Sequence, residues 1–321
     1  MAAALLAPIA MCYGAIAQRR MATPGRSAGI PVICIGNPTV GGAGKTPTAL
    51  AVARLLLAAG KHPFFLSRGF GGELAGPVRV DSRIHRARNV GDEPLLLARV
   101  APAIVAHDRV AGANAARASG ADVVVMDDGF QNPSLKKDLS ILVVDGQRGI
   151  GNENVFPAGP LRVPLGAQLE RANALFVIGQ PSGAGAIMSA AKLHALPIFH
   201  GRLVPDQKML AALASRKVLA FAGIGDPEKF FATLESGGVD VKVRQAFPDH
   251  HRYRQEEAKK LLARAEREGL LLVTTEKDFA RFAGEPDLAA LADAVKVLPV
   301  TLVVEQERAF ADFVLGAMSP K

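Results

Sequence analysis

The chain has 321 residues, 49% of them hydrophobic, which is enough to bury one large or two medium-sized cores. Two cysteines without a Cys-x-x-Cys pair argue against a disulfide scaffold or a zinc ribbon. The formal charge of +8 favours an anionic partner such as a nucleotide, a phosphorylated lipid or an anionic membrane surface, although a generally basic proteome would give the same excess. No RNA-binding signature is present, so we expect no nucleic-acid partner.

The N-terminal segment, residues 2–17, is apolar and is followed by Arg19 and Arg20. It contains Pro8 and is shorter than the roughly 20 residues of a membrane-spanning helix. A secretory signal would carry its positive charge before the apolar run. We therefore expect an apolar helix lying in the membrane interface, with its arginines near lipid headgroups. A helix packed on the protein's own core is the alternative.

Short runs rich in valine and isoleucine alternate with helical patterns over the first two hundred residues. Strands are expected at residues 31–35, 63–66, 103–106, 122–126, 139–144 and 174–178. Helices are expected at 45–59, 94–100 and 109–119. Because the strands are continuously apolar, the pattern predicts a parallel sheet covered by helices on both faces, of the P-loop NTPase type.

A second, smaller α/β block is predicted from about residue 205. Its strands are expected at 218–222, 239–244 and 270–274, with one or two more within 295–304, and its helices at 227–236 and 255–268. We therefore expect two domains. Residues 1–204 would contain the N-terminal helix and the nucleotide-binding sheet, and residues 205–321 would form a domain that closes over the active site.

The strongest chemical signal is a glycine-rich loop between an expected strand and an expected helix. It consists of Thr39, Val40, Gly41, Gly42, Ala43, Gly44, Lys45 and Thr46. Such a loop directs backbone amides at phosphate oxygens, and the helix N-terminus adds a favourable dipole. Lys45 would contact the β- and γ-phosphates, and Thr46 would bind Mg²⁺. A plain glycine-rich turn is the alternative, and Thr39 stands where the strict pattern has its first glycine.

Acidic residues form two further clusters. Asp127 and Asp128 end an expected buried strand, as the magnesium-binding carboxylate of P-loop enzymes does. Asp92 and Glu93 lie in a Gly-Asp-Glu-Pro sequence. A carboxylate there could orient or deprotonate an acceptor hydroxyl, but the residues alone favour simple capping of the following helix.

Three other segments carry polar residues without a decisive pattern. His250 and His251 have no third metal ligand at suitable spacing, so they indicate a surface loop, or a histidine that crosses the domain cleft to help a carboxylate. Asp278 directly follows Lys277, which rules out the spacing of a guanine-recognition motif. Arg68 begins a flexible basic loop that is either an ordinary turn or a contact for an anionic substrate.

In their order, these segments resemble the tetraacyldisaccharide 4′-kinase family of Gram-negative bacteria, the lipid A 4′-kinases. The matching stretches are GNPTVGGAGKTP at 36–47, SRGFGG at 67–72, GDEP at 91–94, DDGFQ at 127–131, GNENVFPAGPLR at 151–162, FPDHH at 247–251 and TTEKD at 274–278. They span most of the chain. GDEP, DDGFQ and PAGPLR in this order are far more specific than the glycine-rich loop alone.

The resemblance implies ATP-dependent phosphorylation of the 4′-hydroxyl of tetraacyldisaccharide 1-phosphate, which gives the bisphosphorylated lipid A precursor, lipid IVA. It also implies a peripheral protein on the cytoplasmic face of the bacterial inner membrane, because the acyl chains of the substrate stay in the bilayer. No obligate protein partner is evident.

By matching position, the resemblance also implies roles for individual residues. The catalytic group would be Asp92, His250 and Lys45. ATP would contact the loop of residues 39–46 and Gln131, and Mg²⁺ would lie near Thr46, Glu93, Asp127 and Asp128. Arg68 and Arg162 would face the substrate, because the guanidinium fork suits phosphate.

The chain departs from the family pattern at two positions. Asn132 follows Gln131 where the family usually has histidine, and Val163 follows Arg162 where it usually has glutamate. We therefore expect no essential imidazole or carboxylate at these two positions.

Two other functions share the glycine-rich loop. A membrane-associated nucleotide switch or metallochaperone-type NTPase would hydrolyse its nucleotide independently of lipid. A kinase for a soluble metabolite would leave the apolar N-terminus without a purpose. A purely structural or nucleic-acid-binding role gives the loop no task and is the least favoured.

Overall fold

The computed structural model describes residues 2–318, which form two α/β halves around two separate sheets. The larger sheet has nine strands in the order β13-β8-β7-β6-β1-β5-β2-β4-β3. They are β1 (Val32–Gly36), β2 (Pro63–Ser67), β3 (Val78–Arg79), β4 (Ala103–Val105), β5 (Val123–Asp127), β6 (Leu139–Asp145), β7 (Ala174–Ile178), β8 (Ile198–Pro205) and β13 (Val300–Val304). All neighbouring strands are parallel except β3 against β4 and β13 against β8.

Helices cover both faces of this sheet, as its fully buried strands require. On one face lie α1 (Ala2–Met21), α5 (Arg109–Ala118), α6 (Leu165–Leu169) and α7 (Gly185–Leu193). On the other lie α2 (Lys45–Ala58), α4 (Asp92–Leu97) and α13 (Glu307–Gly316). The short helix α3 (Ala87–Val90) leads into α4. The predicted fold class, a parallel sheet between helices, is confirmed.

The smaller sheet is fully parallel, with the strand order β10-β9-β11-β12. Its strands are β9 (Lys217–Ala222), β10 (Asp240–Ala246), β11 (Leu271–Thr275) and β12 (Lys296–Leu298). Its helices are α8 (Gln207–Leu213), α9 (Pro227–Ser236), α10 (Gln255–Glu268), α11 (Glu276–Phe282) and α12 (Ala289–Ala294). Each face of this sheet has its own apolar core, so it is a second layered unit.

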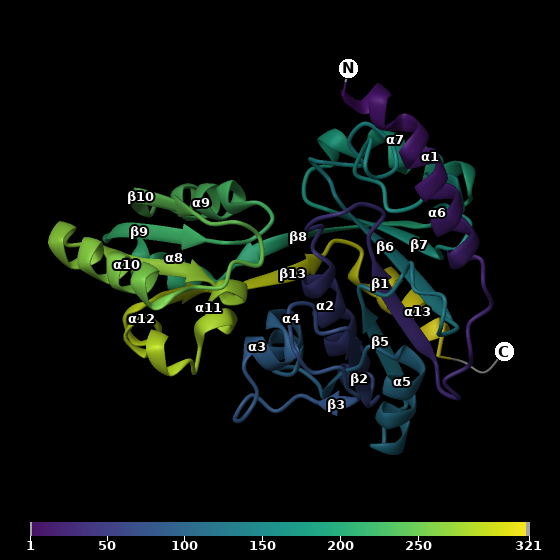
Figure 1. The fold of residues 1–321 in the computed structure, drawn as a ribbon, viewed down its shortest axis with the longest axis horizontal. Coiled ribbons are helices and arrows are strands. Elements are labelled where there is room, and N and C mark those ends of the chain that lie inside the picture. Colours follow the sequence, from purple (N-terminus) through teal and green to yellow (C-terminus); the bar gives the residue numbers. More distant parts are fainter. Residues whose placement is uncertain (1, 319–321) are drawn as a thin grey trace.

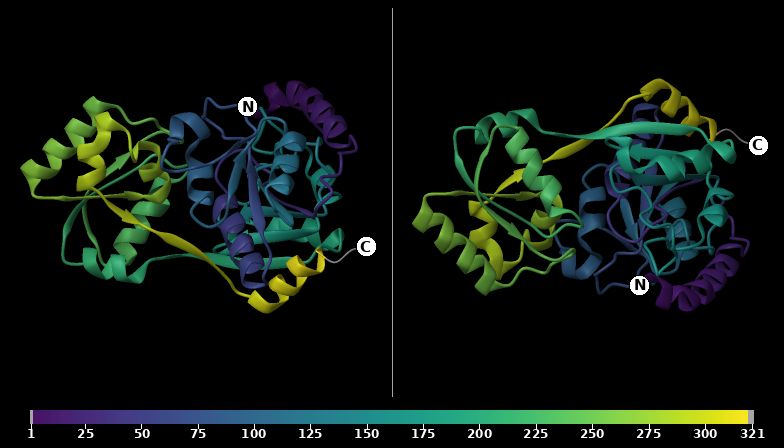
Figure 2. Two further views of the ribbon diagram at one scale, coloured as in Figure 1. Left: turned by 90° about the horizontal axis from the view of Figure 1, so that it is seen from below. Right: turned by 90° about the horizontal axis from the view of Figure 1, so that it is seen from above.

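The chain passes between the two halves twice, along the paired strands β8 and β13 (Figure 2). Val300 to Val304 lie antiparallel to residues 205 to 201, and α13 then buries Phe310 and Val314 against the large sheet. The last part of the chain therefore returns to the first half. The sequence pattern, which assigned everything after residue 204 to the second half, did not anticipate this return.

Candidate active site

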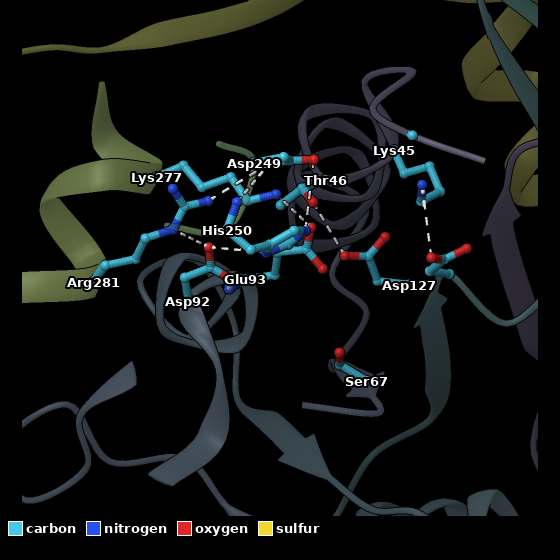
Figure 3. A network of polar contacts seen from close by, with 12 residues as sticks. Lys45, Thr46, Ser67, Asp92, Glu93, Asp127, Asp249, His250, Lys277 and Arg281 are labelled. Carbon is cyan, nitrogen blue, oxygen red and sulfur yellow. Dashed lines mark hydrogen bonds and ion pairs between the residues drawn. The ribbon is translucent and has the colours of Figure 1, made fainter. Parts of the chain in front are cut away.

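The candidate site lies at the carboxyl edge of the large sheet, where the second half faces it (Figure 3). Strands β1 and β5 are parallel neighbours, with Ile35 opposite Asp127. The glycine-rich loop that follows β1 and the acidic pair that ends β5 therefore lie side by side. Ligands of open α/β sheets bind at this edge.

The glycine-rich loop leads directly into α2. Gly44 has a φ of 85°, and a Cβ at this position would collide with Ile178, so glycine is required here. Lys45 is almost buried, with 10% of its side chain exposed. Its Nζ donates to Oδ1 of Asn37 over 3.2 Å and lies 3.7 Å from Oδ2 of Asp128. Asn37 also donates from Nδ2 to the carbonyl of Gly41 over 3.0 Å, which braces the loop.

The segment around Arg162 supports the same loop. The amide of Val40 donates to Pro160 O over 2.8 Å, and the amide of Arg162 donates to Pro38 O over 2.9 Å. Arg162 Nε donates to Thr39 O over 3.0 Å. The PAGPLR segment, residues 157–162, therefore holds the phosphate loop in place through these hydrogen bonds.

The two adjacent aspartates have opposite electrostatic environments. Asp128 forms a two-pronged ion pair with Arg162, at 3.0 and 3.2 Å, and its pKa is lowered because Lys45 and Arg162 outweigh the effect of burial. Asp127 accepts the Thr46 hydroxyl over 3.3 Å. Burial, and secondarily the charges of Glu93 and Asp128, raise the pKa of Asp127 to about 8, and the more distant Lys45 offsets this only in part. Among residues 2–318, therefore, Asp127 is a buried carboxylate without a direct ion pair.

Magnesium fits this arrangement. Oδ1 of Asp127 is buried and has no hydrogen-bond partner within the described part of the chain. Among those residues, no three His, Cys, Asp or Glu side chains come together as a complete metal cage. Mg²⁺ commonly takes only one or two protein carboxylates and completes its shell with phosphate oxygens and water. The donor set of Thr46 and Asp127 is of this kind.

Asp92 and His250 come from opposite halves of the molecule. Asp92 begins α4 and is 5% exposed, and its Oδ2 lies 3.5 Å from Nδ1 of His250. His250 has a φ of 57° and meets the ring of Phe70 edge-on at 4.9 Å. Asp92 Oδ1 also accepts the amide of Glu93 over 2.9 Å within the first turn of α4, whose N-cap is Gly91. Asp92 therefore lies in the first turn, as acidic residues commonly do, and also pairs across to the second half.

Two cations of α11 complete the site. Arg281 Nε donates to Asp92 Oδ2 over 2.7 Å, and Lys277 Nζ donates to Glu93 Oε1 over 2.9 Å. Burial opposes ionisation of Asp92, but the His250 hydrogen bond and the charges of Lys277 and Arg281 together hold its pKa well below the usual range. Neither cation has a sequence signal that predicts a catalytic role. Lys277 and Arg281 are four residues apart, a spacing that places them on the same face of a helix, but no helix was predicted at residues 276–282.

The remaining site residues lie nearby, in different settings. Gln131 donates from Nε2 to Asn37 O over 2.9 Å and to Gln168 Oε1 over 3.0 Å, behind the phosphate loop. Arg68 is exposed directly after β2. Asn132 accepts from Ser134 in a local turn, and Val163 is buried in the core. The two departures from the family pattern thus have structural roles.

A pocket of about 270 Å³ opens beside the pair of Asp92 and His250. Its wall comes from both halves and carries both charges, with Arg88, Arg252, Arg254 and Arg281 beside Asp92, Glu285 and Asp287. The polar, mixed-charge lining beside a buried carboxylate suits a polar acceptor molecule.

A braced glycine-rich loop, a buried lysine, and a second buried carboxylate that pairs with a histidine of the other half are the arrangement of a kinase of the α/β class. A family model described as Tetraacyldisaccharide-1-P 4′-kinase matches residues 2–319, and the chain belongs to this family. Membership confirms the predicted activity, phosphorylation at the 4′ position of tetraacyldisaccharide 1-phosphate in lipid A biosynthesis.

Individual relatives agree with this assignment. The chain is 51% identical to the tetraacyldisaccharide 4′-kinase of Nitrobacter winogradskyi, over 98% of this chain and 94% of that protein. It is 56% identical to the enzyme of the same name from a Methylobacterium species, over 96% and 90% of the two chains. A crystal structure of the "apo" form of LpxK from Aquifex aeolicus in complex with ATP has a TM-score of 0.75 and 26% identity, covering 99% of this chain and 100% of that one.

Proposed function

We propose that this protein transfers the γ-phosphate of ATP from the loop of residues 39–46 to the 4′-hydroxyl of tetraacyldisaccharide 1-phosphate, at the cytoplasmic face of the bacterial inner membrane. One observation carries the proposal. Figure 3 shows Lys45 and Thr46 in the same group of polar side chains as Asp92, whose carboxylate lies 3.5 Å from His250 of the second half. ATP as the donor is supported by the ATP complex of the Aquifex aeolicus relative.

The nucleotide site is proposed to form from the loop amides, Lys45 and Gln131. Lys45 stabilises the negative charge that develops as the bond to the leaving ADP breaks. The second half, which lies between β8 and β13, is proposed to close over the first half. A Cβ on Gly225 would lie only 3.3 Å from the amide nitrogen of Gly42, so a loop of the second half already touches the phosphate loop.

Thr46 and Asp127 are proposed to hold Mg²⁺, with Glu93 and Asp128 close by. The ion, when bound, neutralises the β- and γ-phosphate oxygens. The orphaned oxygen of Asp127 supports this assignment. Asp128 is already neutralised by Arg162 and Lys45, so it orients the lysine instead of serving as the principal ligand.

Asp92 and His250 are proposed to act on the acceptor. The sugar hydroxyl loses its proton to Asp92 while the oxygen attacks the phosphorus in line with the leaving group. Because the pKa of Asp92 is held low, the carboxylate is a weak base, and the imidazole shares the proton. A weak base is adequate because positioning and electrostatics supply most of the acceleration in phosphoryl transfer. Arg68 is proposed to contact the anionic acceptor.

The direct test uses γ-labelled ATP, Mg²⁺ and tetraacyldisaccharide 1-phosphate dispersed in detergent. We expect label in the lipid, and no labelled lipid when Mg²⁺ is chelated. Phosphate release that does not depend on lipid, with no label in the lipid, would instead favour a nucleotide switch.

Helix α1 is proposed to hold the protein on an anionic membrane surface. No helix within residues 2–318 is long and apolar enough to cross a bilayer. One side of α1 packs on the protein through Ala10 and Met21, whereas an outer set of large apolar side chains is exposed, namely Leu5, Ile9, Met11, Tyr13 and Ile16. The packed side agrees with the alternative of a helix on the protein's own core, and the exposed apolar side supports the proposal of membrane contact. Figure 1 shows α1 on the outside of the larger half.

We expect the double substitution Ile9→Glu and Ile16→Glu to weaken vesicle binding at least about tenfold, because each apolar side chain contributes roughly 1.5–3 kcal/mol when buried. Flotation with vesicles of phosphatidylethanolamine and phosphatidylglycerol measures this. The matched control is Ile84→Glu with Val303→Glu, two exposed apolar positions outside α1. Equal binding by both double variants would remove the membrane role of α1.

A further inference from the structure

The first turn of α4 and one face of α11 meet as two adjacent ion pairs. Asp92 and Glu93 are neighbours in sequence, and Arg281 and Lys277 lie one helical turn apart. The two contacts are 2.7 and 2.9 Å long. Arg281 is 4% exposed and Asp92 5%, so the first pair is shielded from water, whereas the second is about one-fifth exposed. The buried pair is therefore the stronger determinant of geometry.

A fully buried carboxylate holds Arg281 from behind. Oδ1 of Asp278 accepts Nη1 of Arg281 over 2.8 Å and also accepts the hydroxyl of Tyr253 and the amide of Gly223, each over 2.9 Å. The carbonyl of Gly223 in turn accepts Nη1 of Arg281 over 2.5 Å. The guanidinium thus has two fixed anchors within the second half, and only Nε reaches across to Asp92.

The same frame holds His250. Its backbone amide donates to the carbonyl of Gly223 over 3.1 Å. Gly223 is tightly enclosed, because a Cβ there would lie 3.0 Å from Pro248 O and 3.2 Å from Asp278 Oδ1. One rigid point of the second half therefore positions both the imidazole and the guanidinium that meet the Asp92 carboxylate.

We propose that Arg281 is a positioning residue for Asp92, and that the anchor of Asp278 and Gly223 sets the carboxylate and His250 in their working geometry. This inference rests on the proposed function, in which Asp92 accepts the acceptor proton. The carboxylate on α4 and its two partners belong to different halves, so the complete group exists only when α11 is docked on α4. Arg281 itself lies behind the carboxylate and acts through it.

The interface offers a matched control. Arg99, which follows the end of α4, and Glu276 of α11 form another ion pair of this interface at 3.6 Å, but Arg99 is exposed, Glu276 is partly exposed and no contact of either with Asp92 is present among the described residues. Loss of this pair removes an ion pair of the same interface without touching the carboxylate. Substituting Arg99 therefore distinguishes an effect on kcat that comes from weaker docking of the two halves from one that comes from a misplaced Asp92.

The test measures kcat and both KM values for the full-length protein with ATP and detergent-dispersed acceptor. We expect Arg281→Met to lower kcat roughly 100-fold, as a misplaced catalytic group does, with KM for ATP changed less than about twofold. Arg281→Lys should have a kcat about tenfold higher than that of Arg281→Met, because an ammonium restores the positive charge but not the several directed donors of the guanidinium. Arg99→Met should remain within about twofold of the parent.

Near-normal kcat in Arg281→Met would overturn the inference, and so would a lysine variant no better than methionine or an equal loss in Arg99→Met. Where Arg281→Met does not fold, Asp278→Asn replaces it, since it keeps the side-chain volume and weakens the anchor. Its kcat should fall about tenfold if positioning depends on that anchor, and an unchanged kcat would overturn the inference. Asp92→Asn, measured in parallel, tests the proposed function separately: normal turnover there would refute Asp92 as proton acceptor, whatever Arg281 does.

Discussion

Replacing Lys45 with alanine should lower phosphoryl transfer to the lipid by about 10²–10³-fold or more, the usual cost of removing one preorganised electrostatic contact to a transition state. Lys45 is the almost buried cation of the phosphate loop, held between Asn37 and Asp128. The fold should survive, because Asp128 keeps its two-pronged pair with Arg162. Labelled lipid measures turnover, and the thermal midpoint measures the fold.

The control for Lys45→Ala is Lys192→Ala on α7, which removes an exposed lysine of the same half. Its turnover should equal that of the parent protein. If Lys45→Ala retained more than about a tenth of normal turnover, its proposed role at the phosphates would be wrong.

Replacing Asp92 with asparagine should lower kcat about 10²–10⁴-fold, the range for loss of a general base. Asparagine has nearly the same shape but no negative charge, so it can neither accept the proton nor neutralise Arg281. Binding of ATP should persist, because Asp92 contacts the second half and not the phosphate loop. Calorimetric titration with ATP checks this point, and labelled lipid measures kcat.

Asp92→Asn should also destabilise the docking of α4 on α11, since it removes one of the two carboxylates that pair with the buried guanidinium of Arg281 and leaves only Asp278, which belongs to α11 itself. Glu276→Gln is the matched control, because it breaks an exposed ion pair of the same interface. Turnover by Asp92→Asn equal to that of Glu276→Gln would refute the catalytic role. The depressed pKa of Asp92 also means that mild acidification leaves it ionised, so an activity loss near pH 6 would belong to another group.

The sequence predicted the large sheet and the phosphate loop well because both have local signals. Strands such as β5 and β7 are unbroken apolar runs, and the glycine pattern of the loop is contiguous. Strand β8 was missed because polar and small residues interrupt it, including His200, Gly201 and Arg202. Its length depends on pairing with β13, about a hundred residues later, which no local pattern reveals.

The predicted site residues fall into several distinct groups because their contacts form only in the folded chain, between residues far apart in the sequence. Asp127 and Asp128 are neighbours with equal formal charge, yet among the described residues Asp128, which has a positive φ, pairs with Arg162 and Lys45, whereas Asp127 forms no direct ion pair. Arg281 and Asp92 are separated by 189 positions, and their contact exists only after the two halves pack. Likewise, the sequence around Asn37 indicates an ordinary turn residue. Only the folded loop shows that its side-chain amide donates to the carbonyl of Gly41.

The paired crossing through β8 and β13 constrains how the cleft can open. A single linker would let one half swivel freely about its bonds, whereas two hydrogen-bonded strands resist rotation and shear and bend most readily across their flat face. The proposed opening and closing of the halves would then follow nearly one path. Each closure would return α11 to the same turn of α4, so that Asp92 and Arg281 meet again without a search over wrong orientations.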